Sequence, residues 1–326
     1  MSETEAELIA RLRGLGADAA AVEAATGQGI KELRRLLREQ LRRRPWPFFV
    51  EHLSQRTLVL RELDRFGEAP HIYVVIGPHK AVVIDTGCNS ASLFDFLSTL
   101  EELEGLELQV VNTHVHYDHI MGNHSFCRPG GHALRGGCRG ICQGARDKRF
   151  SQAWSDTSLG KKVGATIHDF CVTQWLEEGH KIYLDDAVPS EAEALEVLYT
   201  PGHTPDSISL YLPVENRLFT GDLIYPGSIF LFLPGSSLEE FRESLQKLQR
   251  FAAQHPPGLT LSCGHISHSL KVETLDELHG LLAALREGAA RPQIARTPLH
   301  GEPVAVFQTP SFTLMCRRED VAVSQG

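Results

Sequence analysis

The sequence lacks a hydrophobic run long enough to cross a membrane. A spanning helix needs about 20 consecutive apolar residues, and no segment of the 326-residue chain approaches that length. The first seven residues are acidic, and they show neither the basic and then apolar order of a signal peptide nor the composition of an organellar transit peptide. These absences predict a cytoplasmic protein without a membrane span.

An excess of basic residues is also missing. The formal net charge is -9 and the pI is about 6.0, which argues against nucleic acid as the main partner. With 42% hydrophobic and 22% charged residues, the composition is that of a globular protein with a sizeable core. The length allows one large domain with additions, or two domains.

The seven cysteines do not form a disulfide pattern. Their number is odd and their spacing is irregular, so we expect reduced thiols and a reducing compartment. Cys138 and Cys142 share one face if this segment is helical, but no second pair accompanies them. A structural role is therefore favoured over a metal or redox role.

Residues 1–46 differ from the rest and predict a helical N-terminal extension. Three short helices are expected over 5–15, 19–25 and 30–41, separated by glycines. Arginines are concentrated between 34 and 44. They form either a solvated helix face or a docking element that binds a second copy of the chain, a partner or an anionic surface. Pro45, Trp46 and Pro47 then read as a linker.

The residues over 47–290 alternate between strand and helix patterns, which predicts a layered α/β domain. Strands are expected at 57–63, 71–76, 80–86, 108–112, 195–199, 207–212, 216–219 and 258–262, and helices at 90–103, 238–253 and 275–286. Residues 291–326 form a C-terminal extension with short strands at 304–307 and 312–315, to which the sequence assigns no role.

The most informative stretch is Thr113–His119, which follows an apolar strand. His114 and His116 have the same parity, so an extended chain presents both to one ion. Asp118 and His119 lie past the strand end, where a turn directs them to a second ion. Imidazole and carboxylate groups suit a divalent metal such as Zn²⁺.

Four further histidine and aspartate residues lie where apolar strands end in small turns, namely Asp85, His203, Asp222 and His265. Strand ends that converge at one sheet edge are where α/β folds place their chemistry. Asp85 either caps its turn or orients a histidine that binds metal.

Taken in order, the motifs around Asp85, His114–His119, His203, Asp222 and Cys263–His265 resemble those of the metallo-β-lactamase superfamily. The resemblance covers roughly residues 55–285 and implies an αββα sandwich with its site along one edge of two sheets. It implies that 47–290 is the catalytic domain. It implies two Zn²⁺ ions, although Fe or Mn are also compatible with these ligands. The implied ligands are His114, His116 and His203 for the first ion, and Asp118, His119 and His265 for the second. Asp222 would bridge the ions, and Asp85 would orient a ligand.

Details within these motifs favour one branch of the superfamily. True β-lactamases generally carry Cys or Ser at the bridging position, so Asp222 argues against antibiotic hydrolysis. The pattern is closer to glyoxalase II, to lactonases and to acyl-CoA thioesterases. Asp118 and Tyr225 are the candidate catalytic residues. Tyr225, three residues after Asp222, either donates a hydrogen bond to the substrate carbonyl or is a packing residue. Residues 230–233 wall an acyl pocket or belong to the core, and 127–180 form a lid, a substrate wall or a helical insertion.

The resemblance implies a hydrolase in which a hydroxide bridging two zinc ions attacks the carbonyl of an acyl-CoA or glutathione thioester. A lactonase or carboxylester hydrolase is the alternative within the same class. A binding or scaffold protein that retains the metal without catalysis is the alternative from another class.

Overall fold

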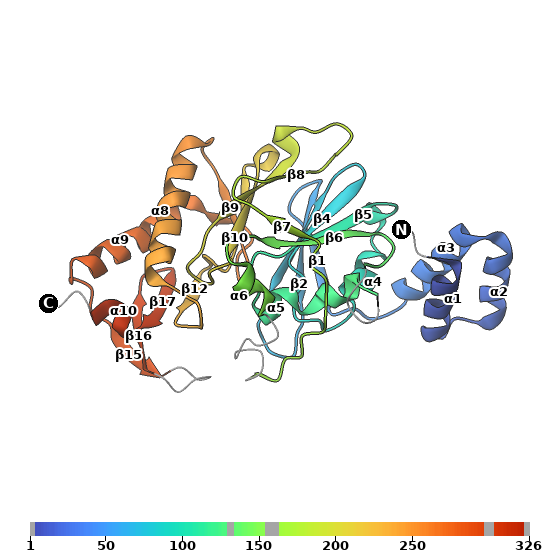
Figure 1. Cartoon of the computed structure of the whole chain (residues 1–326), viewed down its shortest axis with the longest axis horizontal. Coiled ribbons are helices and arrows are strands. Elements are labelled where there is room, and N and C mark those ends of the chain that lie inside the picture. The colour runs from blue at the N-terminus through green and yellow to red at the C-terminus, as the bar shows by residue number, and fades with distance from the viewer. Residues whose placement is uncertain (1–3, 129–133, 154–162, 297–302, 323–326) are drawn as a thin grey trace.

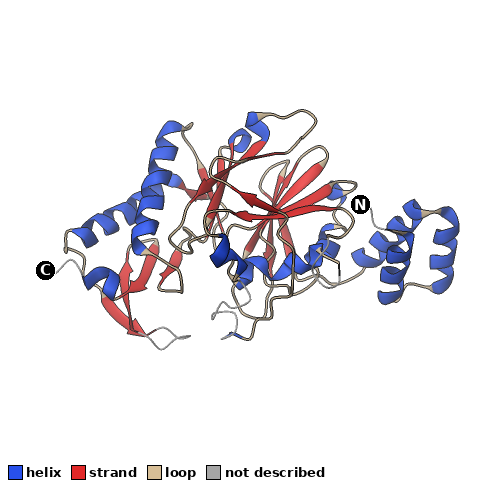
Figure 2. Ribbon diagram, in the orientation of Figure 1, coloured by secondary structure: helices blue, strands red, loops and turns tan. Residues whose placement is uncertain are grey.

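The computed structural model describes residues 4–128, 134–153, 163–296 and 303–322. Its centre is a pair of facing β-sheets (Figures 1 and 2). The first sheet has seven strands in sequence order: β1 (Phe48–His52), β2 (Thr57–Glu62), β3 (His71–Ile76), β4 (Lys80–Ile84), β5 (Glu107–Val111), β6 (Cys138–Gly144) and β7 (Gln174–Leu176). The second has the order β14 (Leu270–Lys271), β13 (Thr260–Cys263), β11 (Arg217–Gly221), β10 (Ile208–Leu212), β9 (Ala194–Tyr199) and β8 (Lys181–Tyr183).

The main core lies between the two sheets because successive side chains of a strand point to opposite faces. In β4, Val82 and Ile84 pack with residues of β9, β10 and β11, whereas Ala81 and Val83 pack on the opposite face beside α4 (Leu93–Leu97). All four side chains are fully or almost fully buried. Apart from Lys80 at its start, β4 is apolar throughout, as expected for a strand buried on both faces.

Helices cover the outer faces and complete the predicted αββα sandwich. Helices α8 (Leu238–Gln254) and α9 (Leu275–Arg286) pack on the second sheet, and α4 packs on the first. The helix predicted over 90–103 is wrong in length, because α4 ends at Leu97 and only a 3-10 turn follows at Glu101–Leu103. The hydroxyls of Ser98 and Thr99 donate, together with their own amides, to the main-chain oxygens of Phe94 and Phe96.

The sequence pattern missed β1 and gave no strand in the insertion over 127–180. Part of that insertion is β6, a parallel strand between β5 and β7 inside the first sheet. A short helix, α6 (Lys148–Gln152), follows it. The insertion is therefore built into the sandwich through β6 near its beginning and β7 near its end. Residues 129–133 and 154–162 lie outside the described residues.

The N-terminal helices α1 (Glu5–Gly14), α2 (Ala19–Gln28) and α3 (Ile30–Arg42) form a bundle at one end of the molecule (Figure 1). The bundle has a core of its own, which includes Leu8, Leu12 and Leu33. Arg11 forms an ion pair with Asp95 of α4, so the bundle contacts the helix that covers the first sheet. Within the described residues no helix is long and apolar enough to cross a membrane.

A third sheet lies at the opposite end and contains most of the described C-terminal segment (Figure 1). Its strands have the order β12 (Gly227–Leu231), β17 (Phe312–Arg317), β16 (Pro303–Gln308) and β15 (Gln293–Arg296), and α10 (Glu319–Ala322) follows. The two short strands expected in this segment are present as β16 and β17. Because β12 pairs in parallel with β17, the C-terminal segment is joined to a strand that begins two residues after Tyr225. The division at 46 and 290 remains a prediction.

Candidate metal centre

The seven residues predicted to bind metal come together at one edge of the sandwich. His114, His203, Asp222 and His265 follow β5, β9, β11 and β13, and the other three lie at the start of α5 (Tyr117–Ile120) or within it. They form two groups, one of His114, His116 and His203 and one of Asp118, His119, Asp222 and His265. Within each group the possible ligand atoms lie within 4.8 Å of one another.

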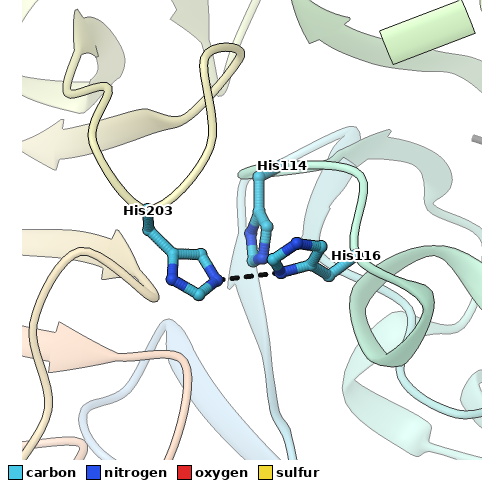
Figure 3. Close-up of side chains that lie close together, drawn as sticks. All are labelled: His114, His116 and His203. Atoms are coloured by element: carbon cyan, nitrogen blue, oxygen red, sulfur yellow. Dashed lines mark hydrogen bonds between the residues drawn. The ribbon is translucent and has the colours of Figure 1, made fainter. Parts of the chain in front are cut away.

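The first group consists of three buried imidazoles whose rings converge on one point (Figure 3). Nε2 of His203 lies 2.8 Å from Nδ1 of His116. Burial and the neighbouring histidines lower the pKa of His116 to about 3 and hold the pKa of His114 well below its ordinary value. Burial also lowers the pKa of His203. These rings are therefore neutral, which is the form that binds a metal ion.

The second group mixes imidazoles with carboxylates. Nε2 of His265 lies 3.2 Å from Oδ2 of Asp118, and Nε2 of His119 lies 3.4 Å from the same oxygen. Burial opposes a charge on either histidine, but Asp222 and Asp118 outweigh it, raising the pKa of His265 to about 10 and that of His119 well above its ordinary value. The carboxylates create a strong demand for positive charge in this group.

Asp222 stands between the two groups. Its Oδ1 lies 3.3 Å from Nε2 of His119, while its Oδ2 lies 3.6 Å from Nε2 of His203 and 4.0 Å from Nε2 of His114. The same Oδ2 lies 3.3 Å from Nε2 of His265. One carboxylate thus faces ligand atoms of both groups, which is the placement that a bridging ligand requires.

Hydrogen bonds on the far side of the rings fix their orientation. Nδ1 of His119 lies 2.8 Å from Oδ2 of Asp85, Nδ1 of His203 lies 3.0 Å from the Phe230 oxygen, and Nδ1 of His265 lies 2.9 Å from the Glu68 oxygen. These acceptors place the ring proton on Nδ1 and leave Nε2 directed into the site.

Three atoms directed into the site have no hydrogen-bond partner among the described residues: Nε2 of His114, Nε2 of His119 and Oδ1 of Asp222. Buried polar atoms are normally satisfied, and a divalent cation satisfies imidazole nitrogen and carboxylate oxygen together. The residues present therefore fit a metal centre.

Asp85 does more than cap a turn. Its Oδ1 accepts from the Thr113 amide and its Oδ2 accepts from the Thr113 hydroxyl, both at 2.7 Å, in addition to facing His119. The backbone of Asp85 has a φ of 63°, which is uncommon for a residue other than glycine. The carboxylate is thereby held beneath the His114–His119 stretch.

Two glycines allow the close packing of this region. A Cβ atom on Gly264 would lie 2.2 Å from Oδ1 of Asp222, and one on Gly122 would lie 2.2 Å from the Thr86 oxygen. Both contacts are too short for any side chain. Glycine at these positions therefore lets the loop of His265 and the end of α5 approach the centre.

Tyr225 is buried beside the second group, and its ring centroid lies 5.4 Å from that of His265. Burial and the nearby Asp222 and Asp118 hold the pKa of its hydroxyl well above the ordinary value. The phenol therefore keeps its proton and can act as a hydrogen-bond donor.

The sequence gave no sign of Glu68, which lies in an irregular segment before β3. Its main-chain oxygen orients His265, and its carboxylate accepts a hydrogen bond from the hydroxyl of Tyr117. Burial and the charge of Asp118 raise the pKa of the Glu68 carboxyl. Contacts of this kind join distant parts of the chain, and no local spacing predicts them.

The metallo-β-lactamase superfamily model matches residues 65–265, which is more than half of the chain and spans all seven residues of the two groups. This chain belongs to the metallo-β-lactamase superfamily. The superfamily and the His/Asp groups together indicate the use of a divalent metal.

Relatives in this superfamily include named hydrolases. The acyl-coenzyme A thioesterase MBLAC2 of Gallus gallus is 31% identical over 196 residues, which cover 56% of this chain and 67% of that protein. The hydroxyacylglutathione hydrolase of Saccharophagus degradans is 27% identical and covers 54% of each chain. A protein of Aspergillus versicolor named as the putative transcription factor avaE is 28% identical over 82% of this chain and 86% of its own length.

Solved structures show the same fold. A β-lactamase domain protein from Burkholderia ambifaria superposes with a TM-score of 0.54 at 17% identity, covering 73% of this chain and 77% of that chain. The metallo-β-lactamase IND-7 gives a TM-score of 0.53 at 16% identity, covering 74% of this chain and 100% of that chain.

Proposed function

We propose that this protein is a dinuclear metal hydrolase of acyl thioesters, of the acyl-CoA or glutathione type. The observation that carries the proposal is the position of Asp222, whose two oxygens face both ligand groups. A carboxylate in this position would be a ligand to two ions at once, and such a pair would supply an activated water molecule for hydrolysis. The thioester class is supported by the relatives named acyl-coenzyme A thioesterase and hydroxyacylglutathione hydrolase.

In this proposal His114, His116 and His203 hold the first ion, and Asp118, His119 and His265 hold the second. Asp222 is shared. Both ions are assigned as Zn²⁺, with Fe and Mn as the other metals that such ligands accept. When bound, two such ions supply a water molecule with a pKa near neutrality and polarise a carbonyl group.

The residues of the chain prepare the centre for this chemistry. Asp85 keeps the ring proton of His119 on Nδ1, and the main-chain oxygens of Phe230 and Glu68 do the same for His203 and His265. Tyr225 retains its proton at pH 7 and donates it as a hydrogen bond to the carbonyl oxygen of the substrate. No side chain has to act as a nucleophile.

A lactonase or carboxylester hydrolase is the second candidate. The position of Tyr225 beside His265 favours an ester or lactone substrate as much as a thioester, because a hydrogen-bond donor there can contact the carbonyl oxygen of any of them. The name of the Aspergillus versicolor relative suggests gene regulation, but a net charge of -9 offers no electrostatic footprint for nucleic acid.

Metal analysis followed by a substrate panel tests the proposal. The metal-replete protein should contain nearly two equivalents per chain and hydrolyse acyl-CoA or lactoylglutathione faster than an acyl-homoserine lactone. Turnover of the lactone alone would favour the second candidate. Turnover of none of these would support a metal-binding scaffold and overturn the proposed activity.

The variant Asp222→Ala tests the bridging role. It should lower the metal content and the turnover together, whereas Asp276→Ala, at an exposed aspartate of α9, should change neither. Wild-type turnover in Asp222→Ala would refute the bridge.

A further inference from the structure

Ile266, the residue directly after His265, has an unusual backbone conformation. Its φ is 64°, in the left-handed region that β-branched residues rarely adopt. The Ser267 amide donates to the His265 oxygen at 2.6 Å, and the Cys263 amide donates to the Ser267 oxygen at 3.0 Å. Two main-chain hydrogen bonds therefore hold Ile266 at the tip of a tight turn. Glycine or asparagine would adopt this conformation at lower cost.

Packing within the chain does not account for isoleucine at this position. The residue is 66% exposed, so most of its apolar surface faces solvent. The strain is therefore not offset by burial in the core. A strained and exposed residue beside a catalytic centre is a candidate for contact with a ligand.

The side chain of Ile266 extends from the His265 turn toward the start of β12. A Cβ atom on Gly227 would lie 3.3 Å from Cδ1 of Ile266, so the end of this side chain rests close to the Gly227 backbone. Gly227 is two residues after Tyr225, whose ring packs against His265. Ile266 consequently spans the rim between a residue of the second ligand group and the candidate hydrogen-bond donor.

We propose that Ile266 determines specificity by contacting the apolar acyl chain of the substrate. This inference rests on the proposed thioesterase function and adds the acyl chain as the part of the substrate that is recognised. With the carbonyl group at the metal centre and its oxygen at Tyr225, an acyl chain that leaves over the His265 rim meets the exposed face of Ile266. The contact removes apolar surface from water on both sides, so its benefit grows with chain length.

The substitutions Ile266→Gly and Ile266→Asn separate this role from a structural one, because both relieve the backbone and leave the turn intact. In the zinc-loaded full chain, kcat/KM for octanoyl-CoA and palmitoyl-CoA should fall about tenfold or more, the loss expected for one buried aliphatic side chain. The value for acetyl-CoA should stay within about twofold of wild type, and Ile266→Val should retain the long-chain preference. The melting temperatures of Ile266→Gly and Ile266→Asn should be equal to or above that of the wild type.

Val188→Gly is a matched control, since Val188 is an exposed apolar residue, 71% accessible, in a loop outside the metal centre. It should leave the chain-length profile unchanged. A uniform loss across acetyl, octanoyl and palmitoyl substrates in Ile266→Gly, or no loss, would overturn the role of Ile266 while the thioesterase function stands. Absence of thioester hydrolysis in the wild type would instead overturn the function on which the inference rests.

Discussion

Nδ1 of His203 lies 3.0 Å from the main-chain oxygen of Phe230, so a strand of the third sheet contacts the first ligand group. Phe230 belongs to β12, and the only ladder partner of β12 among the described strands is β17. Phe230 pairs there with Met315. The C-terminal segment therefore supports the orientation of a proposed metal ligand, although it lies outside the superfamily match.

Breaking the ladder between β12 and β17 should weaken metal binding. We expect Met315→Pro to lower the affinity of the first ligand group about 10- to 100-fold, as loss of a hydrogen bond behind a metal-binding histidine does. Metal titration of the apoprotein measures the effect, and a denaturation curve at saturating metal confirms that the variant is folded.

The matched control is Ala295→Pro, which places a proline on β15 at the far edge of this sheet. It should leave metal affinity unchanged. An equal loss of affinity in both variants would mean that the sheet acts through general stability and that Phe230 has no specific orienting role.

Asp85 should matter through its carboxylate rather than through its turn. Asp85→Ala removes the acceptor for His119 and both acceptors for Thr113, so we expect metal affinity to fall about 10- to 100-fold. Asp85→Asn keeps one oxygen and should lose less. Isothermal titration with Zn²⁺ would distinguish the two, and identical affinities in the alanine and asparagine variants would contradict an orienting carboxylate.

The convergence of the proposed ligand residues was predictable because several of them lie next to an apolar strand that ends in a short turn, and such ends converge in this fold. His114, Asp222 and His265 illustrate this. Among the residues behind the proposed ligands, Asp85 was singled out from the sequence, whereas Phe230 and Glu68 were not. Phe230 acts through a main-chain oxygen, which every residue possesses, and Glu68 follows no strand and belongs to no motif.

Helix and strand lengths were less predictable than their order. The apolar spacing of Leu93, Phe96, Leu97 and Leu100 is that of a long helix, yet α4 stops at Leu97. Ser98 and Thr99 follow it, and their hydroxyls bond back to the main-chain oxygens of Phe94 and Phe96, which the periodicity does not reveal. The glycine-rich start of the insertion obscured β6, whose neighbours in the sheet come from distant parts of the sequence.

Asp206 should make the stability of the protein depend on pH. The residue is buried, its Oδ2 accepts a hydrogen bond of 3.0 Å from the Ser151 hydroxyl, and its Oδ1 has no partner among the described residues. Burial raises its pKa from 3.8 to about 6. The native state thus binds this proton more tightly than the unfolded state does.

Stability from this group is fully present below pH 3.8 and is lost as the pH rises through about 6. The loss above that pH is about 3 kcal/mol at most, from 1.36 kcal/mol per pKa unit. Asp206→Asn removes the titration, so the difference in unfolding free energy between variant and wild type should grow in favour of the variant between pH 4 and pH 7. Urea unfolding at a series of pH values measures this, and a difference independent of pH would refute the assignment.

The last prediction concerns the N-terminal bundle. Its helices share a core that is separate from the clusters of the sandwich. Its contacts to α4 include the partly buried ion pair Arg11–Asp95, and Trp46 directly after the bundle packs its edge against Phe96. No residue of the two ligand groups lies in it. Deletion of residues 1–44 should therefore leave kcat and the metal content within about twofold of wild type, because the bundle has its own core and supplies no residue to either ligand group.

The same deletion should change assembly or solubility, because it removes the arginine-rich face of α3 and exposes the side of α4 that the bundle covers. Light scattering of the deleted and full-length proteins at equal concentration detects this change. A large loss of turnover with normal metal content would show instead that the bundle takes part in substrate binding. In that case, adding the separate bundle to the deleted protein should restore activity.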